Sequence, residues 1–465
     1  MRASYHESDP FASSSFEVVR RFILESREEP PVSFEDYERE LHRRVQAWEA
    51  EVVGAQLADY DIDEARIEVE GQVFRNKMKS VKEYHCLAGT FEVERTLYVP
   101  ASGGGKAICP LESCAGIVEG CWSPLAARVM AQAVAISTPK EASSLFRELG
   151  GMQPSTSSLD RLPKALSEKW EARREAFETE LREQEQIPAE AVAVGVSLDG
   201  VQVPMKDGER AEKRSQSDKR PKGPAGYREV GCGTITFYGL EGEALQTIRY
   251  GRMPEAKKAT LKSQLSAELQ SIFASEPGLE LVGLSDGAPD HWQFLGELPG
   301  EIGTAGLEMK KSVDLFHVLE HVKSALDAYH GESTPESKAA FEECRLWLRE
   351  SSDGAKRVLR ALRYRRGRSR GSPRTAIDRE IRYIEKRTEL MRYKDLLDEN
   401  LPVGSGVVEA ACKTLASERL KRSGMSWREP GLQAILTLRS LLQSDRWHRA
   451  WQLLADEYRS DVLAA

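Results

Sequence analysis

The sequence predicts an α/β protein with a mixed sheet covered by helices on both faces, followed by a long helical stretch and preceded by a helical region with a small β element. Three observations predict this class. Residues 191–198 form an apolar run typical of a buried strand, residues 233–250 carry a hairpin signal, and nearly everything after residue 317 has helical periodicity. With 465 residues, the chain has room for two to four domains of about 150 residues.

Composition excludes several classes of protein. Hydrophobic residues make up 40% and charged residues 30% of the chain, which excludes a disordered or collagen-like protein. No stretch approaches the ~18 apolar residues of a membrane span, and the first residues lack the order of a signal peptide, so we expect a cytoplasmic protein without membrane contact. Seven Cys without a regular framework fit a reducing compartment. The net charge of −8 argues against general binding to polyanions.

The N-terminal part is predicted to hold helices around a small β element. Residues 33–57 begin with a capping-box pattern and continue with apolar residues spaced by three and four, and residues 65–100 alternate as short antiparallel strands do. From Ser123, the spacing of helix starts and breaks is that of a helix-turn-helix, whose last helix would carry Arg161 and Lys164 toward DNA. An ordinary three-helix packing unit explains the same pattern.

The segment after residue 188 places acidic residues at the ends of predicted strands. Asp199 follows the apolar strand 191–198, and Asp286 follows a later strand at residues 279–284. The order strand, hairpin, helix, strand, helix, strand, helix is that of a ribonuclease H-like fold, in which these two strands are neighbours. Glu409, early in a later helix, can complete the cluster. Taken singly, an Asp-Gly pair is usually part of a turn. A lone Glu near the start of a helix usually serves to interact favourably with the helix dipole.

Three carboxylates that converge repel one another unless cations lie between them. Oxygen ligands of this kind suit Mg²⁺, or Mn²⁺, better than Zn²⁺. We therefore expect Asp199, Asp286 and Glu409 to be metal ligands of a two-metal site. The expected segments are residues 1–122 (helices plus the β element), 123–187 (helix-turn-helix-like unit and linker helix), 188–316 (first part of the ribonuclease H-like core), 317–400 (all-helical stretch), 401–425 (Glu-bearing helix) and 426–465 (helical tail).

Four motifs resemble those of the DDE transposases of bacterial insertion sequences, above all the ISKra-type family, which is akin to Mutator-like transposases. They are Ser-Leu-Asp199-Gly, Leu-Ser-Asp286-Gly-Ala-Pro-Asp-His-Trp292, Asp314-Leu-Phe-His317-Val-Leu-Glu-His321, and Gly-Ser-Gly-Val-Val-Glu409-Ala-Ala-Cys-Lys413. The similarity covers about residues 191–451. The Glu409 segment is its most specific part, and Asp199 alone is the least specific.

The resemblance implies an activity, partners and roles for single residues. It implies metal-dependent cleavage of DNA at transposon ends and transfer of the 3′-hydroxyl into target DNA, with Asp199, Asp286 and Glu409 as ligands and residues 317–400 as a helical insertion in the core. It also implies double-stranded DNA as partner, at least a dimer on that DNA, and a place at the bacterial nucleoid. Asp314 and His317 fit the family's Asp/Cys-x-x-His signature. His317 is a candidate for orienting the attacking group, with a structural histidine as the alternative.

Basic residues suggest where DNA would bind. The run 356–374 carries nine basic residues and no acidic one, which favours phosphate contact. Its candidates are Arg363, Arg365, Arg366, Arg368 and Arg370, and further candidates in the matched segments are Lys413, Arg419, Lys421 and Arg422.

Two other functions remain open from the sequence. A catalytically inactive, transposase-derived DNA-binding protein would keep the fold and lose the chemistry. The pattern His317-Val-Leu-Glu320-His321 matches the H-x-x-E-H helix of one class of zinc peptidase, although no third ligand is evident. A zinc ribbon around Cys109 and Cys114 is not expected, because no C-x-x-C pair is present.

Overall fold

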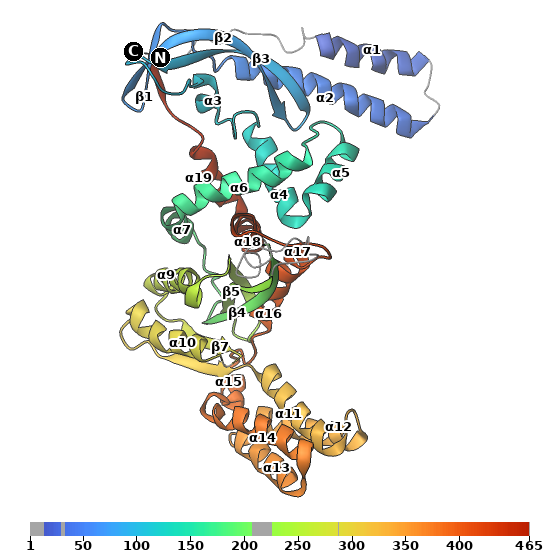
Figure 1. The fold of residues 1–465 in the computed structure, drawn as a ribbon, viewed down its shortest axis with the longest axis vertical. Coiled ribbons are helices and arrows are strands. Elements are labelled where there is room, and N and C mark those ends of the chain that lie inside the picture. Colours follow the sequence, from blue (N-terminus) through green and yellow to red (C-terminus); the bar gives the residue numbers. More distant parts are fainter. Residues whose placement is uncertain (1–13, 29–32, 207–225, 287, 465) are drawn as a thin grey trace, which may run out of the picture. The chain divides into compact units, whose positions relative to one another are not determined.

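A computed structural model describes residues 14–28, 33–206, 226–286 and 288–464 of the chain (Figure 1). It is a mixed α/β protein with two sheets. The chain divides into two compact units, of which the first contains residues 1–178 and 445–465 and the second residues 179–444. The finer division into six segments stays a prediction.

The first unit combines two long helices, a four-stranded antiparallel sheet and a group of short helices. Ser33 caps the second helix by accepting a hydrogen bond from the Asp36 backbone N–H, as the capping-box pattern predicts. The sheet order is β3-β2-β1-β9. The elements are α1 (Ser14–Glu28), α2 (Phe34–Ala58), β1 (Arg66–Val69), β2 (Gln72–Cys86), β3 (Gly89–Pro100), α3 (Pro110–Ala115), α4 (Pro124–Ile136), α5 (Pro139–Leu149), α6 (Thr156–Ala172), α7 (Arg174–Glu183, which crosses into the second unit), α19 (Trp447–Asp456) and β9 (Val462–Ala464).

Helices α4, α5 and α6 begin where the sequence places helix starts. Ser123, Thr138 and Ser155 each cap one of them through a side-chain oxygen. Trp170 of α6 is buried, so this helix is anchored in the core of the first unit. A DNA-reading role for the three helices stays a prediction.

The second unit is built on a five-stranded sheet of order β6-β5-β4-β7-β8. The strands are β4 (Ala193–Met205), β5 (Gly226–Tyr238), β6 (Ala244–Arg252), β7 (Glu280–Ser285) and β8 (Met309–Val313). Strands β6, β5 and β4 pair antiparallel, whereas β7 and β8 continue from β4 in parallel. The predicted pairing of the first strand with the one before Asp286 is therefore confirmed.

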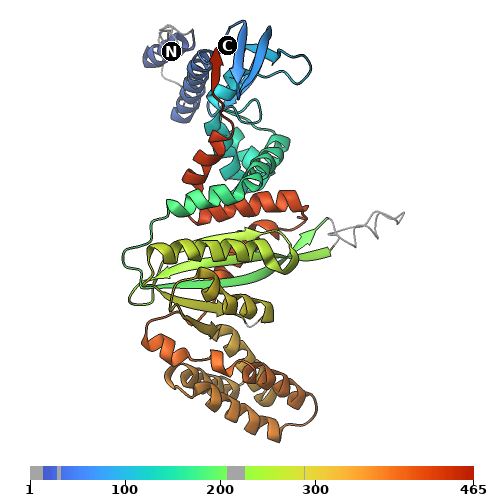
Figure 2. The same cartoon turned by 90° about the vertical axis from the view of Figure 1, so that its left-hand side faces the viewer.

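Helices cover both faces of this sheet. On one face, α9 (Ala259–Ser275) and α10 (Pro289–Ile302) bury apolar side chains against β4, β5, β6 and β7, and Figure 2 shows α9 lying along the strands. On the other face lie α15 (Tyr393–Asp398), α16 (Gly406–Ala411) and the almost wholly buried α18 (Glu429–Gln443). The remaining short elements are the 3₁₀ turns Ala256–Lys258 and Thr388–Leu390, the π-helical stretch Cys412–Ser417 and α17 (Glu418–Leu420).

A separate helical cluster follows β8. It consists of α11 (Leu315–His330), α12 (Pro335–Glu350), α13 (Gly354–Arg368) and α14 (Gly371–Glu385), which share one apolar core with Met391 and Tyr393 (Figure 1). The helical stretch predicted between strand and Glu409 is present. Within the described residues, no helix has the length and apolar character needed to cross a bilayer.

Candidate active site

Strand register brings Asp199 and Asp286 together. The last paired residues of the parallel strands β4 and β7 are Ser197 and Leu284, and each aspartate comes two residues after its strand's member of that pair. Neighbouring strands lie about 4.8 Å apart and residues two positions apart share a face. Both carboxylates therefore leave adjacent strands at the same level and on the same face of the sheet.

The strand that carries Asp199 is longer than the sequence predicts. Residue 199 does not end the strand but lies inside β4, opposite Cys232 of β5. The apolar run ends at Leu198 because the parallel neighbour β7 ends there, while the antiparallel hairpin with β5 continues to Met205. The prediction that Asp199 terminates its strand is wrong, although its place beside Asp286 is the expected one.

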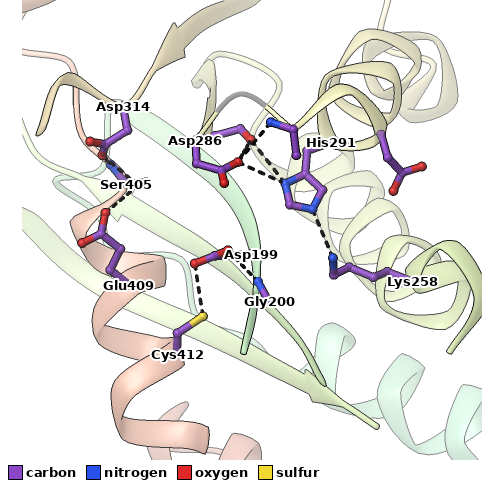
Figure 3. A network of polar contacts seen from close by, with 12 residues as sticks. Asp199, Gly200, Lys258, Asp286, His291, Asp314, Ser405, Glu409 and Cys412 are labelled. Atoms are coloured by element: carbon purple, nitrogen blue, oxygen red, sulfur yellow. Dashed lines mark hydrogen bonds and ion pairs between the residues drawn. The ribbon is translucent and has the colours of Figure 1, made fainter. Parts of the chain in front are cut away.

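Glu409 reaches the same region from helix α16. Cys412, on the turn after Glu409, places its Sγ 3.6 Å from Asp199 Oδ2. Burial, the charge of Asp314 and the charge of Asp199 raise the pKa of Glu409, whereas a hydrogen bond from Ser405 opposes this rise. Figure 3 shows Asp199, Asp286 and Glu409 in the same region, each carried by a different segment of the chain. Glu409 and Asp199 therefore belong to one network, whereas the convergence of all three carboxylates on a metal stays a prediction.

The helix that carries Glu409 continues as a π-helix. Residues Cys412–Ser417 follow α16 directly and contain the buried Cys412, Leu415 and Ala416. Such π-helical turns are rare and often occur at functional sites. Here the wider turn begins at Cys412, whose Sγ lies beside Asp199. The sequence pattern did not indicate this irregularity.

Asp314 is a fourth carboxylate of this network. It is fully buried and caps α11 by accepting a 2.6 Å hydrogen bond from the His317 backbone N–H. Its other oxygen accepts from the backbone N–H and, at 2.7 Å, from the hydroxyl of Ser405. The Ser405 hydroxyl also lies 3.1 Å from Glu409 Oε1. Ser405 therefore links Asp314 to Glu409, a role that no sequence motif revealed.

Asp286 has the opposite electrostatic setting from Glu409. His291 is the largest cause that lowers the pKa of Asp286 to about 2, and the Ala288 backbone N–H adds a 3.1 Å hydrogen bond to Oδ1. The Nδ1 atom of His291 lies 3.7 Å from that oxygen and 3.3 Å from the Ser285 hydroxyl. Asp286 is therefore held in its ionised form.

A lysine sets the tautomer of His291. The imidazole is buried, and its Nε2 lies 3.3 Å from the Lys258 Nζ, which as an ammonium group can only donate. Nε2 must then accept, so Nδ1 carries the proton and faces Asp286. Lys258 has a φ of 53° and ion-pairs with Glu229 at 2.5 Å. A left-handed lysine stores about 1–2 kcal/mol of strain, which is typical of functional sites.

The donor set fits divalent cations that prefer oxygen. Asp199, Asp286 and Glu409 offer only carboxylate oxygens, and the pKa of Glu409 is raised first by burial and then by the neighbouring charges of Asp314 and Asp199. The carboxylates now bind protein groups instead, since Asp199 Oδ1 accepts from the Gly200 N–H at 2.6 Å. Among the described residues, no group of three or more His, Cys, Asp or Glu is already arranged to hold a metal ion. Coordination would require side-chain rotation.

His317 lies beside this network and not among the three carboxylates. Its Nδ1 is 3.4 Å from Glu320 Oε2, and its ring contacts His321 and Tyr383 edge-on. The His321 Nδ1 is 2.6 Å from Glu380 Oε2 and its ring stacks on Tyr383. These contacts favour a packing role for His321 over the zinc ligation that the H-x-x-E-H pattern suggests.

The predicted DNA-contacting residues have different surroundings. Arg363 and Arg366 of α13 ion-pair with Glu385 and Asp378 of α14, each at 2.6 Å. Arg365 lies 3.2 Å from the His330 ring, and Arg368 covers the Tyr364 ring at 3.6 Å. Exposed candidates are Arg363, Arg368, Arg370, Lys413, Lys421 and Arg161. Lys164 is half-buried and pairs with Asp160 at 2.5 Å.

Arg419 requires a correction. It is only 2% exposed, and its guanidinium group lies 5.3 Å above the Trp427 ring and beside the Met425 sulfur. A side chain this buried stabilises the fold and does not reach a phosphate. Arg422 is half-buried and donates to the Glu418 carbonyl oxygen at 3.0 Å.

The cysteines near the first sheet are packed thiols. Cys86 and Cys109 are buried, and burial raises the pKa of both thiols, which disfavours the thiolate that zinc requires.

Comparisons with known proteins give distant structural similarity alone. No protein-family model matches the sequence, and no curated protein matches it. Among solved structures, the chain is similar to the one titled "Drosophila P element transposase strand transfer complex", with 13% sequence identity and a TM-score of 0.26. The alignment covers 72% of this chain and 83% of that chain. A TM-score this low does not establish a shared fold.

Proposed function

We propose that this chain is a DDE-type transposase that cleaves DNA strands at the ends of a mobile element and joins the resulting 3′-hydroxyl to target DNA. The observation that supports the proposal is that Asp199 and Asp286 follow the pairing of the adjacent strands β4 and β7 on one face of the sheet, with Glu409 on a helix that packs beside Asp199 (Figure 3). The strand order and directions are those expected of a ribonuclease H-like core, with α11–α14 as its insertion.

Each carboxylate has a defined part in this proposal. Asp199, Asp286 and Glu409 would hold two Mg²⁺ ions, which when bound supply activation of a water or 3′-hydroxyl and stabilisation of the leaving oxygen. His291 keeps Asp286 ionised and oriented through its Nδ1–H. Ser405 holds Glu409 until its carboxylate is needed as a ligand. No protein nucleophile is required.

The proposal predicts metal-dependent cleavage that depends on the carboxylates. Purified protein is incubated with a plasmid bearing the element's ends and Mg²⁺, and strand breaks are compared with those from a variant carrying Asp199→Asn, Asp286→Asn and Glu409→Gln together. We expect breaks at the ends with the wild type alone. Equal breakage by both proteins would show that a contaminating nuclease acts, and DNA binding without breakage by either would favour a transposase-derived binding protein.

His291→Ala is expected to reduce the cleavage rate by about 10- to 100-fold, the usual effect of removing a group that orients a metal ligand. The loss arises because Asp286 loses the N–H group that fixes its carboxylate. His291→Asn, which keeps a neutral N–H donor, should recover part of the rate in the same assay. Full activity of His291→Ala would remove His291 from the site.

The exposed Arg368, at the end of α13, and Arg370, directly before α14, predict a salt effect. Replacing Arg368 and Arg370 with Ala should make the negative slope of log K against log salt shallower by about 1.8, roughly 0.9 for each phosphate that is no longer neutralised. Replacing Arg363 and Arg366, which pair with Glu385 and Asp378, should make the slope shallower by less than that. Fluorescence anisotropy with a labelled duplex at several salt concentrations measures both slopes. Equal slopes for all three proteins would exclude α13 from the DNA interface.

A further inference from the structure

Helix α14 reaches the candidate site through one tyrosine. The Tyr383 hydroxyl donates a 2.6 Å hydrogen bond to the backbone carbonyl oxygen of Asp286, which is 97 positions away in the sequence. The backbone N–H of Asp314 binds the preceding carbonyl, that of Ser285. The contact from Tyr383 therefore holds the chain at the point where β7 has ended and Asp286 must be placed.

Packing fixes the position of this hydroxyl. The Tyr383 ring stacks on His321 with 3.6 Å between ring centroids, and the Arg387 guanidinium covers it at 4.0 Å. His321 is itself anchored by Glu380, whose side chain is almost fully buried. With its ring held by these groups, the tyrosine cannot move without disturbing α11 and α14.

Helix α11, against which α14 packs, also reaches Glu409. Asp314 at the start of α11 binds Ser405, and Ser405 contacts Glu409. His317, whose backbone N–H is bound to Asp314, contacts both His321 and Tyr383 through its ring. A continuous set of contacts thus runs from Glu409 through α11 and α14 to Asp286.

We propose that Tyr383 is a positioning residue that sets the place of Asp286 relative to Glu409, and that the helical insertion acts on metal binding through it. This inference rests on the proposed function. It assigns to α11–α14 a part in arranging the carboxylates, in addition to any contact with DNA. Tyr383 itself touches the backbone of Asp286 and not the reacting atoms.

The test uses Tyr383→Phe, which removes the hydroxyl and keeps the stacked ring. We expect the Ala288 amide, which binds Asp286 Oδ1, to exchange its hydrogen about five- to tenfold faster by mass spectrometry, the factor expected for one missing hydrogen bond. The half-saturating Mg²⁺ concentration for cleavage should rise by a similar factor, while DNA affinity stays unchanged. Tyr98→Phe in the first unit is the matched control, because it also removes buried bonds from a tyrosine hydroxyl to backbone carbonyls.

Several results would overturn the inference. Exchange at Ala288 and Mg²⁺ dependence equal to those of the wild type would show that Tyr383 does not position Asp286. Faster exchange throughout α11–α14 without a change in Mg²⁺ dependence would indicate a structural role alone. If the wild-type protein shows no metal-dependent cleavage, the proposed function fails, and exchange at Ala288 alone then decides whether Tyr383 holds Asp286.

Discussion

Asp286→Asn is expected to lower metal-dependent cleavage more than about 100-fold, because even groups that only orient a metal ligand typically contribute 10- to 100-fold. The substitution should also lower stability without metal. His291 lowers the pKa of Asp286 to about 2, below its ordinary value of 3.8, so the ionised carboxylate stabilises the folded state. This contribution is present above pH 3.8 and is lost as the pH falls toward 2.

Cleavage rates at pH 7 and thermal unfolding between pH 2 and pH 7 check both parts of this prediction. Asp290→Asn is the matched control, because Asp290 lies four residues further on, is half-buried, and pairs with Lys262 at 2.7 Å. It should keep nearly full activity, since a partly exposed ion pair contributes on the order of 1 kcal/mol to stability and this pair holds no proposed metal ligand. Wild-type cleavage by Asp286→Asn would contradict its assignment as a ligand.

Glu409→Gln is expected to cause a comparable loss of cleavage with no loss of stability. Burial and the charges of Asp314 and Asp199 raise the pKa of Glu409 above its ordinary value of 4.5. The ionised form is therefore disfavoured in the folded protein, and wild-type stability falls as the pH rises through that raised pKa. At pH 7 without metal, the glutamine variant should unfold at the same temperature as the wild type or higher.

Asp286→Asn is expected to lower the thermal stability, whereas Glu409→Gln is expected to leave it unchanged or raise it. If the carboxylates served only the fold, both substitutions would lower the stability. Thermal unfolding at pH 4 and pH 7 measures the effect for Glu409→Gln, and the difference from wild type should shrink at pH 4. Glu418→Gln, on the exposed surface of α17, is the control and should change neither activity nor stability appreciably. A Glu409→Gln variant that is active, or that is strongly destabilised at pH 7, would show that Glu409 serves the fold instead.

The sheet of the second unit could be predicted because local patterns determine it. Apolar strands, a hairpin and helix starts occur in an order with few possible pairings, and the structure has the predicted neighbours β4 and β7. The extension of β4 beyond Asp199 was missed because residues 199–202 pair with β5 alone. These residues are less buried than those before them, and their sequence is no longer a continuous apolar run. Strand β9 lies near the C-terminus and pairs with β1 near the N-terminus, and no sequence pattern around residues 462–464 predicted this strand.

The surroundings of the site could not be read from the sequence. Arg419 carries a charge that suggests the surface, yet Trp427 and Met425 enclose it. Ser405, Lys258 and Tyr383 gain their significance from contacts with residues far away in the chain, such as the 91 positions between Asp314 and Ser405. Spacing along a helix or strand predicts which residues share a face of that element. It does not predict which distant segment of the chain packs against that face.

The central claim is that Asp199, Asp286 and Glu409 together hold divalent cations. Anomalous scattering from crystals of the protein grown with Mn²⁺ tests it most directly, because Mn²⁺ takes the same oxygen ligands as Mg²⁺ and can be located without assumptions about the protein. We predict Mn²⁺ peaks bounded by these three side chains, with Ser405 released from Glu409. Mn²⁺ bound only elsewhere, or Glu409 still held by Ser405 while metal occupies the two aspartates alone, would contradict the account.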